Sequence, residues 1–315
     1  MSQKEPADHS SENDYPKLWL ATFAVMLACV SFGTVPYFAK SLTDAGLSSS
    51  AIAFYRYILS AIIFAPFLFK DRSNFPIAYW GFFSGIVVGV TWIGYVVAIE
   101  TVPVSTAGVI YMSYPVFTLI IGWIFFKNRL GWRSMVAALS ILIAATIATA
   151  PEAITGDDWP SILMLLATPL GFGFGINILT TKLIAIPPIA RPGSFCLGAV
   201  VGLAPMLWLM DDGVVLPPDS RSWLLIAGIG LLTAVVPQIL YTYFAPKIGA
   251  ARTAMAGSVE LPTMFLVGAL AFGEALTWHQ LVAGGIVVSA IALTPARANR
   301  NVSTNLTLQK EDQDG

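Results

Sequence analysis

Charged residues are scarce in this sequence. Only 11% of its 315 residues are Asp, Glu, Lys or Arg, whereas 56% are hydrophobic; a soluble domain carries about 25% charged residues. So few charges exclude a water-soluble body of this size, because they could not cover its surface. Apolar runs of about 20 residues, long enough to cross a hydrocarbon core of ~30 Å, recur along the chain. They predict a polytopic membrane protein.

Residues that carry catalysis or metal binding are equally sparse. The only histidines are His9 and His279, and both cysteines, Cys29 and Cys196, fall inside apolar runs, where burial is expected. We find no P-loop, no HExxH motif and no paired metal ligands. The GFGFG run at 171–175 lies within an apolar span and indicates close helix packing rather than nucleotide binding. We expect no cofactor, no metal, no enzymatic activity and no nucleic-acid partner.

Ten apolar spans divide the chain, and each must be helical because the hydrocarbon core offers no water to backbone groups. Polar tails at 1–17 and 296–315 are expected to be disordered. The expected spans are 18–39, 50–69, 76–98, 104–126, 132–150, 159–181, 192–210, 222–244, 251–272 and 277–295.

Lysine and arginine positions orient these spans. With a cytoplasmic N-terminus, all but three of the 17 lie in inside segments; Lys40 and Arg221 fall in outside loops and Arg56 within a span. This bias predicts a multi-pass protein of the cell (inner) membrane with both termini in the cytoplasm.

Two sequence echoes indicate an internal repeat. FGTVPYFAK at 32–40 is matched by FGINILTTK at 174–182, 142 residues later. The run at 106–126 is echoed at 253–273 when their prolines are aligned, with an offset of 147. Chance likeness between apolar helices is the alternative, but glycine, lysine, proline and threonine all match in register.

The echoes predict two copies of one five-helix unit, at 18–150 and 159–295. Five is an odd number, so the second copy must enter the membrane from the opposite side. Inverted repeats of this kind are a mark of secondary transporters, whose halves exchange conformations and so open to either side in turn.

The same stretches resemble the drug/metabolite transporter superfamily in its EamA-type form. Ala107–Lys127 is similar to the family's fourth span, and FYRYILSAIIFAPF, which contains Arg56, is similar to its arginine-bearing second span. Val259–Gly285 is similar to the ninth span and its exit, including a Gly-Glu and a Leu-Thr-x-x-Gln step. Leu261 separates Glu260 from the proline, a departure from the family pattern. The resemblance implies a ten-helix carrier, often an exporter of amino acids, amines or other small metabolites.

Two ionisable residues are expected deep in the membrane, Arg56 and Glu260. Charge there costs ~2.5–3.5 kcal/mol on insertion scales and indicates function by default. Arg56 could instead extend toward the interface. Glu260 could bind a cationic group, carry a proton, or simply pair with Arg56 or a polar side chain.

Polar aromatic residues concentrate in the third, fourth and eighth spans and could cage an ammonium group or stack on an aromatic solute. Packing, or a place in an interfacial belt, is the alternative for each of them. They include Trp92, Tyr95, Tyr111, Tyr114 and Tyr241.

Two amides and two lysines complete the candidate residues. Asn177 and Gln238 are mid-span amides that could contact a solute or join helices. Lys40 and Lys182 are related by the repeat and could be interfacial anchors or gates, with Asp44 or Glu100 as the acidic neighbour of Lys40. Prolines within spans are expected to kink helices and free carbonyls that line a cavity.

We therefore expect a secondary transporter, and an exporter, of small metabolites such as amino acids or amines, working by alternating access. Its cavity would be lined by spans one, three, four, six, eight and nine. Its partners would be the solute, the lipid bilayer and protons as a coupling ion, in a monomer or a homodimer. An intramembrane enzyme and a non-transporting scaffold are the rivals, and the scaffold predicts a tightly packed interior without a polar-lined cavity.

Overall fold

The structure, a computed structural model, describes residues 15–128, 131–148, 159–210 and 213–293. The polar tails lie outside these residues, except that the end of the first tail begins helix α1. Within the described part of the chain every regular element is helical, and one isolated bridge pairs Leu47 with Val214. The prediction of an all-α membrane protein is confirmed.

Fourteen α-helices follow one another in the described residues, with two 3-10 turns and one π-helical turn. The α-helices are α1 (Tyr15–Phe32), α2 (Val35–Asp44), α3 (Ser49–Phe69), α4 (Phe75–Thr101), α5 (Val104–Tyr111), α6 (Tyr114–Phe126), α7 (Trp132–Ala148), α8 (Trp159–Thr181), α9 (Arg191–Leu203), α10 (Met206–Leu209), α11 (Ser220–Gly230), α12 (Val236–Gly257), α13 (Glu260–Phe272) and α14 (Trp278–Leu293). The 3-10 turns are Arg72–Asn74 and Leu183–Ala185, and the π-helical turn is Leu231–Val235.

Six helical stretches among the described residues are long and apolar enough to cross a membrane, and three shorter apolar helices accompany them. The longest, Ser220–Phe272, has 53 residues and takes in two of the expected spans. Every expected span overlaps one of these stretches, while the count of ten membrane crossings stays a prediction.

Four of the expected spans are broken within their length, and besides the breaks at α9–α10 and α12–α13, two lie next to Pro36 and Pro115. The chain passes from α1 to α2 at Gly33–Thr34 and from α5 to α6 at Met112–Ser113. Pro36 and Pro115 lie in the first turn of the second helix of each pair, where the missing N–H of proline leaves no hydrogen bond unmade. Kinks were expected at these prolines. The expectation that each span is one continuous helix was wrong at these two positions.

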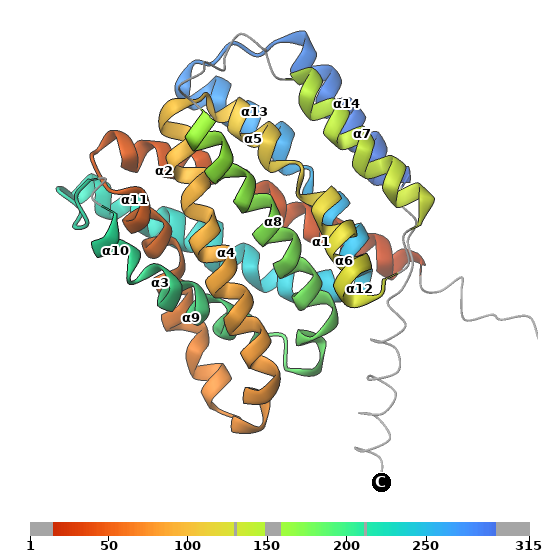
Figure 1. The fold of residues 1–315 in the computed structure, drawn as a ribbon, viewed down its shortest axis with the longest axis horizontal. Coiled ribbons are helices and arrows are strands. Elements are labelled where there is room, and N and C mark those ends of the chain that lie inside the picture. The colour runs from red at the N-terminus through yellow and green to blue at the C-terminus, as the bar shows by residue number, and fades with distance from the viewer. Residues whose placement is uncertain (1–14, 129–130, 149–158, 211–212, 294–315) are drawn as a thin grey trace, which may run out of the picture.

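Helix α4 packs along both α8 and α9, and backbone contact between these helices depends on glycine (Figure 1). A Cβ atom at Gly85 or Gly198 would collide with the carbonyl of Phe195 or Phe82, and one at Gly171 would collide with α4 as well. Small residues let membrane helices approach in this way. The close packing predicted for the GFGFG run is confirmed.

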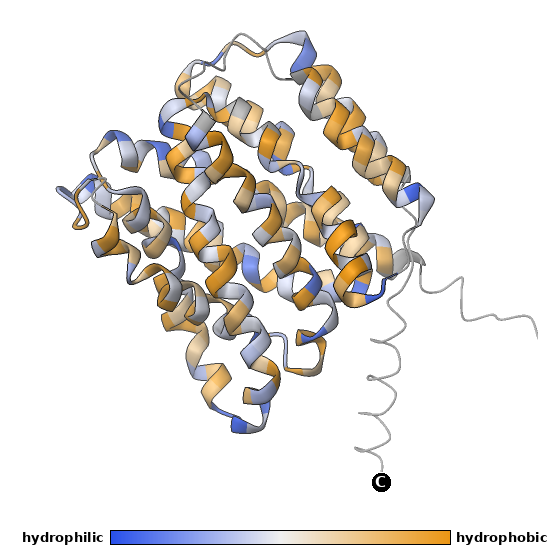
Figure 2. Ribbon diagram, viewed as in Figure 1, coloured by the Kyte–Doolittle hydropathy of each residue, from blue (hydrophilic) through white to orange (hydrophobic). Residues whose placement is uncertain are grey.

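Hydrophobic side chains are exposed along the outward faces of the helices, and hydrophilic residues gather at helix ends, for example at the α3–α4 turn (Figure 2). Leu20, Phe23, Phe125 and Leu270 are among the exposed apolar side chains. A bilayer requires this distribution, because lipid tails cover the apolar faces and water meets the ends.

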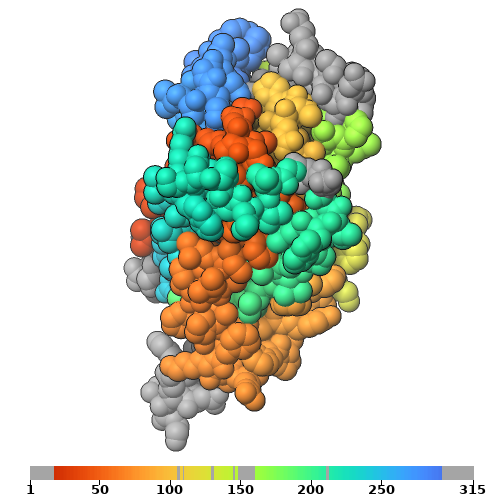
Figure 3. Space-filling model, turned by 90° about the vertical axis from the view of Figure 1, so that its left-hand side faces the viewer, coloured from red at the N-terminus to blue at the C-terminus, as the bar shows by residue number. Residues whose placement is uncertain are grey.

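The connections α2–α3, α4–α5, α10–α11 and α13–α14 lie at one end of the molecule, and α3–α4 and α8–α9 lie at the other (Figure 1). At the first end the α10–α11 segment lies against α2 and α3 (Figure 3). The Ser48 N–H donates to the Val214 carbonyl at 2.9 Å, and the Val214 N–H donates to the Gly46 carbonyl at 3.0 Å. These two bonds join loops that are distant in the sequence.

Candidate functional site

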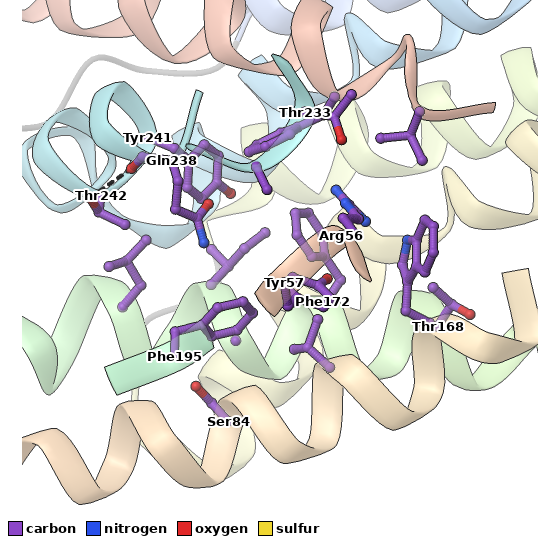
Figure 4. Close-up of a pocket in the computed structure, with 18 of the residues that line it drawn as sticks. Arg56, Tyr57, Ser84, Thr168, Phe172, Phe195, Thr233, Gln238, Tyr241 and Thr242 are labelled. Atoms are coloured by element: carbon purple, nitrogen blue, oxygen red, sulfur yellow. Dashed lines mark hydrogen bonds between the residues drawn. The ribbon is translucent and has the colours of Figure 1, made fainter. Parts of the chain in front are cut away.

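A cavity lies between helices that come from all along the chain (Figure 4). All six spans expected to line it contribute. The second and seventh spans also contribute, through Arg56 and Tyr57 of α3 and through Arg191 and Phe195 of α9, and sequence reasoning missed their part. The lining residues are Phe32, Val35, Arg56, Tyr57, Ser84, Val88, Trp92, Tyr95, Tyr111, Thr168, Phe172, Gly175, Ile176, Leu179, Leu183, Arg191, Phe195, Thr233, Ala234, Gln238, Tyr241, Thr242, Glu260 and Met264.

Aromatic rings form a continuous row along this cavity. Trp92 stacks on Tyr95 with 6.0 Å between ring centroids, and Tyr95 meets Tyr111 edge-on at 5.9 Å. Phe172 follows Tyr111 at 5.7 Å and Tyr241 follows Phe172 at 6.4 Å. Four of the five predicted aromatic residues therefore meet in one wall, whose faces suit an aromatic, apolar or cationic group.

Tyr114, the fifth predicted aromatic residue, lies behind this row and does not line the cavity. Its ring is fully buried against Tyr111 and Phe172, at 5.2 and 5.0 Å between centroids. Its hydroxyl has no hydrogen-bond partner in the described part of the chain and lies against Gly257. Tyr114 thus supports the row from behind.

Arg56 is buried on α3 and lines the cavity. Its guanidinium lies over the ring of Trp92, with 4.5 Å from Cζ to the centroid, and over that of Tyr57 at 5.3 Å. Its Nε has no hydrogen-bond partner among the described residues. The side chain is directed into the cavity (Figure 4) rather than out to an interface, which excludes the alternative that it extends toward water.

Glu260 is the first residue of α13 and is 1% exposed. The chain turns between α12 and α13, where the Leu261 N–H bonds to the Ser258 carbonyl at 3.1 Å, and this turn directs the Glu260 carboxyl into the cavity. The Cys29 thiol and the Tyr111 hydroxyl are its polar neighbours, and its Oε1 has no hydrogen-bond partner within the described residues.

Gln238 of α12 also lines the cavity, and its side chain points toward the same space as Arg56 (Figure 4). One turn later the Thr242 hydroxyl donates to the Gln238 carbonyl at 2.7 Å and stabilises this stretch of α12. The Gln238 amide is placed for solute contact.

Asn177, by contrast, joins helices. Its Nδ2 donates to the carbonyls of Thr118 and Gly173, both at 2.9 Å, and its Oδ1 accepts from Asn128 at 3.4 Å. It does not line the cavity. Of the two alternatives left open for this amide, the geometry favours helix packing.

The two lysines also lie away from the cavity lining. The Lys40 ammonium is 5.8 Å from the ring centroid of Phe272, and the Lys182 ammonium is 5.3 Å from that of Trp80. Glu100 accepts a hydrogen bond from Ser49 at 2.6 Å, and no ion pair links it to Lys40 among the described residues. These positions match interfacial anchors better than ion-paired gates.

Arg191 is the main cavity residue that sequence reasoning missed, because it was counted as a loop cation. Its Nε donates to Ile186 O at 3.1 Å, Nη1 to Thr242 O at 2.7 Å and Nη2 to Ile184 O at 3.0 Å. These bonds tie the α8–α9 connection to α12. An arginine that donates to three backbone carbonyls follows no sequence motif, so this role of Arg191 could not be predicted from the sequence.

The sixth span, which forms α8, was expected to line the cavity, but its lining residues were not named, and periodicity could have found them. Its lining residues recur every three or four positions, at Thr168, Phe172, Ile176 and Leu179, which is one face of a helix. The aromatic search had counted only Trp and Tyr and so passed over Phe172.

Within the described residues no group of three or more His, Cys, Asp or Glu side chains could hold a metal ion. The cavity presents instead one buried guanidinium, one buried carboxyl, one amide and a row of rings. Such a set can bind and orient a small solute.

Comparisons with known proteins point the same way. The model of the EamA-like transporter family matches residues 19–150 and again residues 159–295. The "Probable biotin transporter" of Pseudomonas aeruginosa is 22% identical over 279 residues, which cover 85% of this chain and 93% of the relative. The "Riboflavin transporter" of Brucella anthropi is 21% identical over 279 residues, which cover 84% and 95%. These names indicate transport rather than catalysis, and they differ in solute.

One solved crystal structure has a TM-score of 0.69 to this chain at 17% sequence identity, and the match covers 87% of this chain and 96% of the solved one. At this identity the likeness shows a shared fold.

Proposed function

Because this chain belongs to the EamA-like transporter family, we propose that it is a secondary transporter, and an exporter, of small metabolites such as amino acids or amines. The cavity carries this proposal, because a buried guanidinium and a buried carboxyl line it, and one atom of each has no hydrogen-bond partner among the described residues. Such atoms are costly unless a ligand satisfies them. A scaffold predicts a packed interior, so the cavity counts against it.

Alternating access requires two halves that move, and we place them at 18–150 and 159–295. The double family match supports this division. So does packing, since α1 lies on α12 as α8 lies on α4, and α3–α9 and α7–α14 pair equivalent helices across the halves. The break between α5 and α6 recurs between α12 and α13, within the second sequence echo.

We place both termini in the cytoplasm of a cell whose inner membrane holds the protein. Loops assigned to the outside meet one another, which supports this assignment: Val214 bonds to Gly46 and Ser48, and the Val104 N–H donates to the Glu274 carboxylate at 3.2 Å. The cavity lining reaches Leu183 and Arg191 at the proposed cytoplasmic end.

Proteoliposomes test the proposal. Purified full-length protein should give saturable counterflow of labelled amino acids or amines, and an imposed pH gradient should drive accumulation if protons are coupled. Glu260→Gln should abolish pH-driven accumulation but retain downhill counterflow at saturating solute. Driven accumulation that survives Glu260→Gln rejects the proton role, and absence of counterflow from correctly folded protein rejects the transporter.

A further inference from the structure

We propose that Glu274 is a gating residue, whose hydrogen bond across the interface between α5 and α13 keeps the cavity closed to one side of the membrane. This α5–α13 interface joins the two halves, because α5 lies in the first segment that matches the family and α13 in the second. The inference rests on the proposed transport function and names a residue that controls access to its site.

The α5–α13 interface runs from one end of the molecule to the cavity, and the two helices lie side by side (Figure 1). Far from the cavity, the Val104 N–H at the start of α5 donates to the Glu274 carboxylate at 3.2 Å. In the middle, Gly108 lies against Met264, whose Sδ would be 2.8 Å from a Cβ atom at this glycine. At the cavity, Tyr111 ends α5 beside the first residue of α13. Separation of the two helices would therefore open a path to the site.

The end of α13 directs the Glu274 carboxylate toward this amide. Gly273 follows the helix in the left-handed conformation (φ 68°), and the Glu274 N–H returns to the Gly268 carbonyl at 3.0 Å. The carboxyl then lies over Gly268, since a Cβ atom there would be 2.5 Å from Glu274 Oε2. The first N–H groups of a helix have no partner within it, and a carboxylate is their most favourable acceptor.

Helix α6, the equivalent of α13 in the first half, has the same ending. Lys127 takes the left-handed conformation there (φ 53°), and the Asn128 N–H returns to the Gly122 carbonyl at 2.9 Å. The Asn128 side chain also reaches the opposite half, where it donates to Asn177 of α8 at 3.4 Å. In the proposed inverted arrangement the two turns face opposite sides of the membrane. Each side then has one side chain that links the halves.

The two links differ in strength. Glu274 offers a charged acceptor to a helix N-terminus, whereas the bond from Asn128 joins two neutral amides at a distance near the limit for a hydrogen bond. We therefore expect Glu274 to contribute more than Asn128 to the balance between the two open states. Loss of its carboxylate should favour the state that is open along the α5–α13 interface.

Thiol accessibility from each side of the membrane tests this role. The reporter is Thr233→Cys, at a buried residue of the cavity lining, and the probe is a membrane-impermeant maleimide. Intact cells expose the proposed outer side, which holds the α13–α14 connection, and inverted membrane vesicles expose the other. The chain without the reporter gives the background, since Cys29 and Cys196 are completely buried.

Glu274→Ala should raise the labelling rate in intact cells by about 10- to 100-fold, the range for one charge-assisted hydrogen bond, without raising it in inverted vesicles. Asn128→Ala should do the reverse, by about 2- to 10-fold. Gly268→Ala keeps the charge but displaces the carboxyl, so it should act in the same direction as Glu274→Ala.

Glu100→Ala is the matched control. Glu100 lies at the same end and accepts a hydrogen bond from Ser49 at 2.6 Å, but both residues belong to the first half. Its loss should leave labelling from both sides unchanged. If Glu274→Ala does not fold, Glu274→Gln keeps an acceptor without the charge, and a smaller rise in intact cells is expected.

The outcomes separate this inference from the transporter. Labelling that is unchanged in the Glu274 variants, or that rises equally from both sides, overturns the gating role. So does a change in the same direction for Glu274→Ala and Asn128→Ala. None of these results affects the transport proposal, because labelling requires no solute. Opposite changes in a folded protein that shows no counterflow would support the gate and reject transport.

Discussion

Two arginines line the same cavity and are used in opposite ways. The three guanidinium nitrogens of Arg191 each donate a hydrogen bond to a backbone carbonyl. The guanidinium of Arg56 instead lies over two aromatic rings, and its Nε has no hydrogen-bond partner among the described residues. Both side chains are buried, at 6% and 8% exposed. Burial and charge therefore do not distinguish a structural arginine from a binding one, and hydrogen-bond satisfaction does.

The largest expected effect follows from replacing Arg191, whose guanidinium nitrogens all have hydrogen-bond acceptors. Arg191→Ala leaves the carbonyls of Ile184, Ile186 and Thr242 without their donor, at about 1–3 kcal/mol for each buried group that water does not reach. We expect a clear fall in Tm by differential scanning fluorimetry in detergent. Arg56→Ala should change Tm little, because it also removes an uncompensated charge. Equal losses of Tm from the two variants would contradict the comparison.

Transport should show the opposite order. Arg56→Gln should weaken solute binding about 10- to 100-fold with nearly unchanged Tm, because the guanidinium group expected to contact the solute is lost. Arg191→Gln should lower the amount of folded protein while the folded fraction keeps its solute affinity. Concentration-dependent counterflow, normalised to folded protein, measures both. An affinity loss in Arg191→Gln as large as in Arg56→Gln would assign solute contact to both arginines.

Smaller effects are expected from a similar comparison between two tyrosines, Tyr111 and Tyr114. Tyr111 lines the cavity with its hydroxyl beside Glu260, while the Tyr114 hydroxyl is buried without a partner in the described part of the chain. Tyr111→Phe should lower solute affinity about 3- to 10-fold, as for one ordinary hydrogen bond. Tyr114→Phe should leave affinity unchanged and Tm equal or slightly higher, because an unsatisfied buried hydroxyl is removed. Titrations of the two variants side by side distinguish lining from support.

The smallest effect is expected at the surface, far from the buried charges. Asp219 caps α11 by accepting a hydrogen bond from the Ser222 N–H at 2.7 Å, and that bond holds the pKa of this exposed carboxyl below its ordinary value. Since the folded state lowers this pKa, the cap stabilises the protein above the unfolded value near pH ~4 and is lost as pH falls through the folded value. Asp219→Asn should keep the cap and lose its pH dependence; Asp219→Ala should lose both, with a small fall in Tm at pH 7.

Sequence alone predicted the spans, the glycine packing and much of the cavity wall. The length of an apolar run indicates that a helix is buried in lipid or protein, so the helices could be predicted from run length. It does not record which face is turned inward, and the second and seventh spans were therefore missed as lining elements. Arg56 and Glu260 stood out because charge within an apolar run is rare.

The misses share a physical cause. Asn177 and Gln238 have the same amide, yet Asn177 finds carbonyls on two helices and Gln238 faces the cavity. Arg191 was assigned to a loop, although the chain around it folds back and supplies three acceptors. Partners of this kind are set by tertiary contact and leave no periodic pattern.

The paired α2–α3 and α10–α11 loops have a consequence for how this end of the molecule opens. Within the described residues, this bridge is formed by two main-chain hydrogen bonds, from Ser48 to Val214 and from Val214 to Gly46. Each contributes about 0.5–1.5 kcal/mol net, because water replaces it on opening. Together they bias the bridge toward the closed arrangement by roughly 5- to 150-fold, which is small enough for thermal fluctuation to open it. The bridge also requires glycine, because a Cβ atom at Gly213 would lie 2.9 Å from the Gly46 carbonyl oxygen and 3.1 Å from the Ser48 nitrogen, so a larger residue there would push apart the backbone groups that hold this end together.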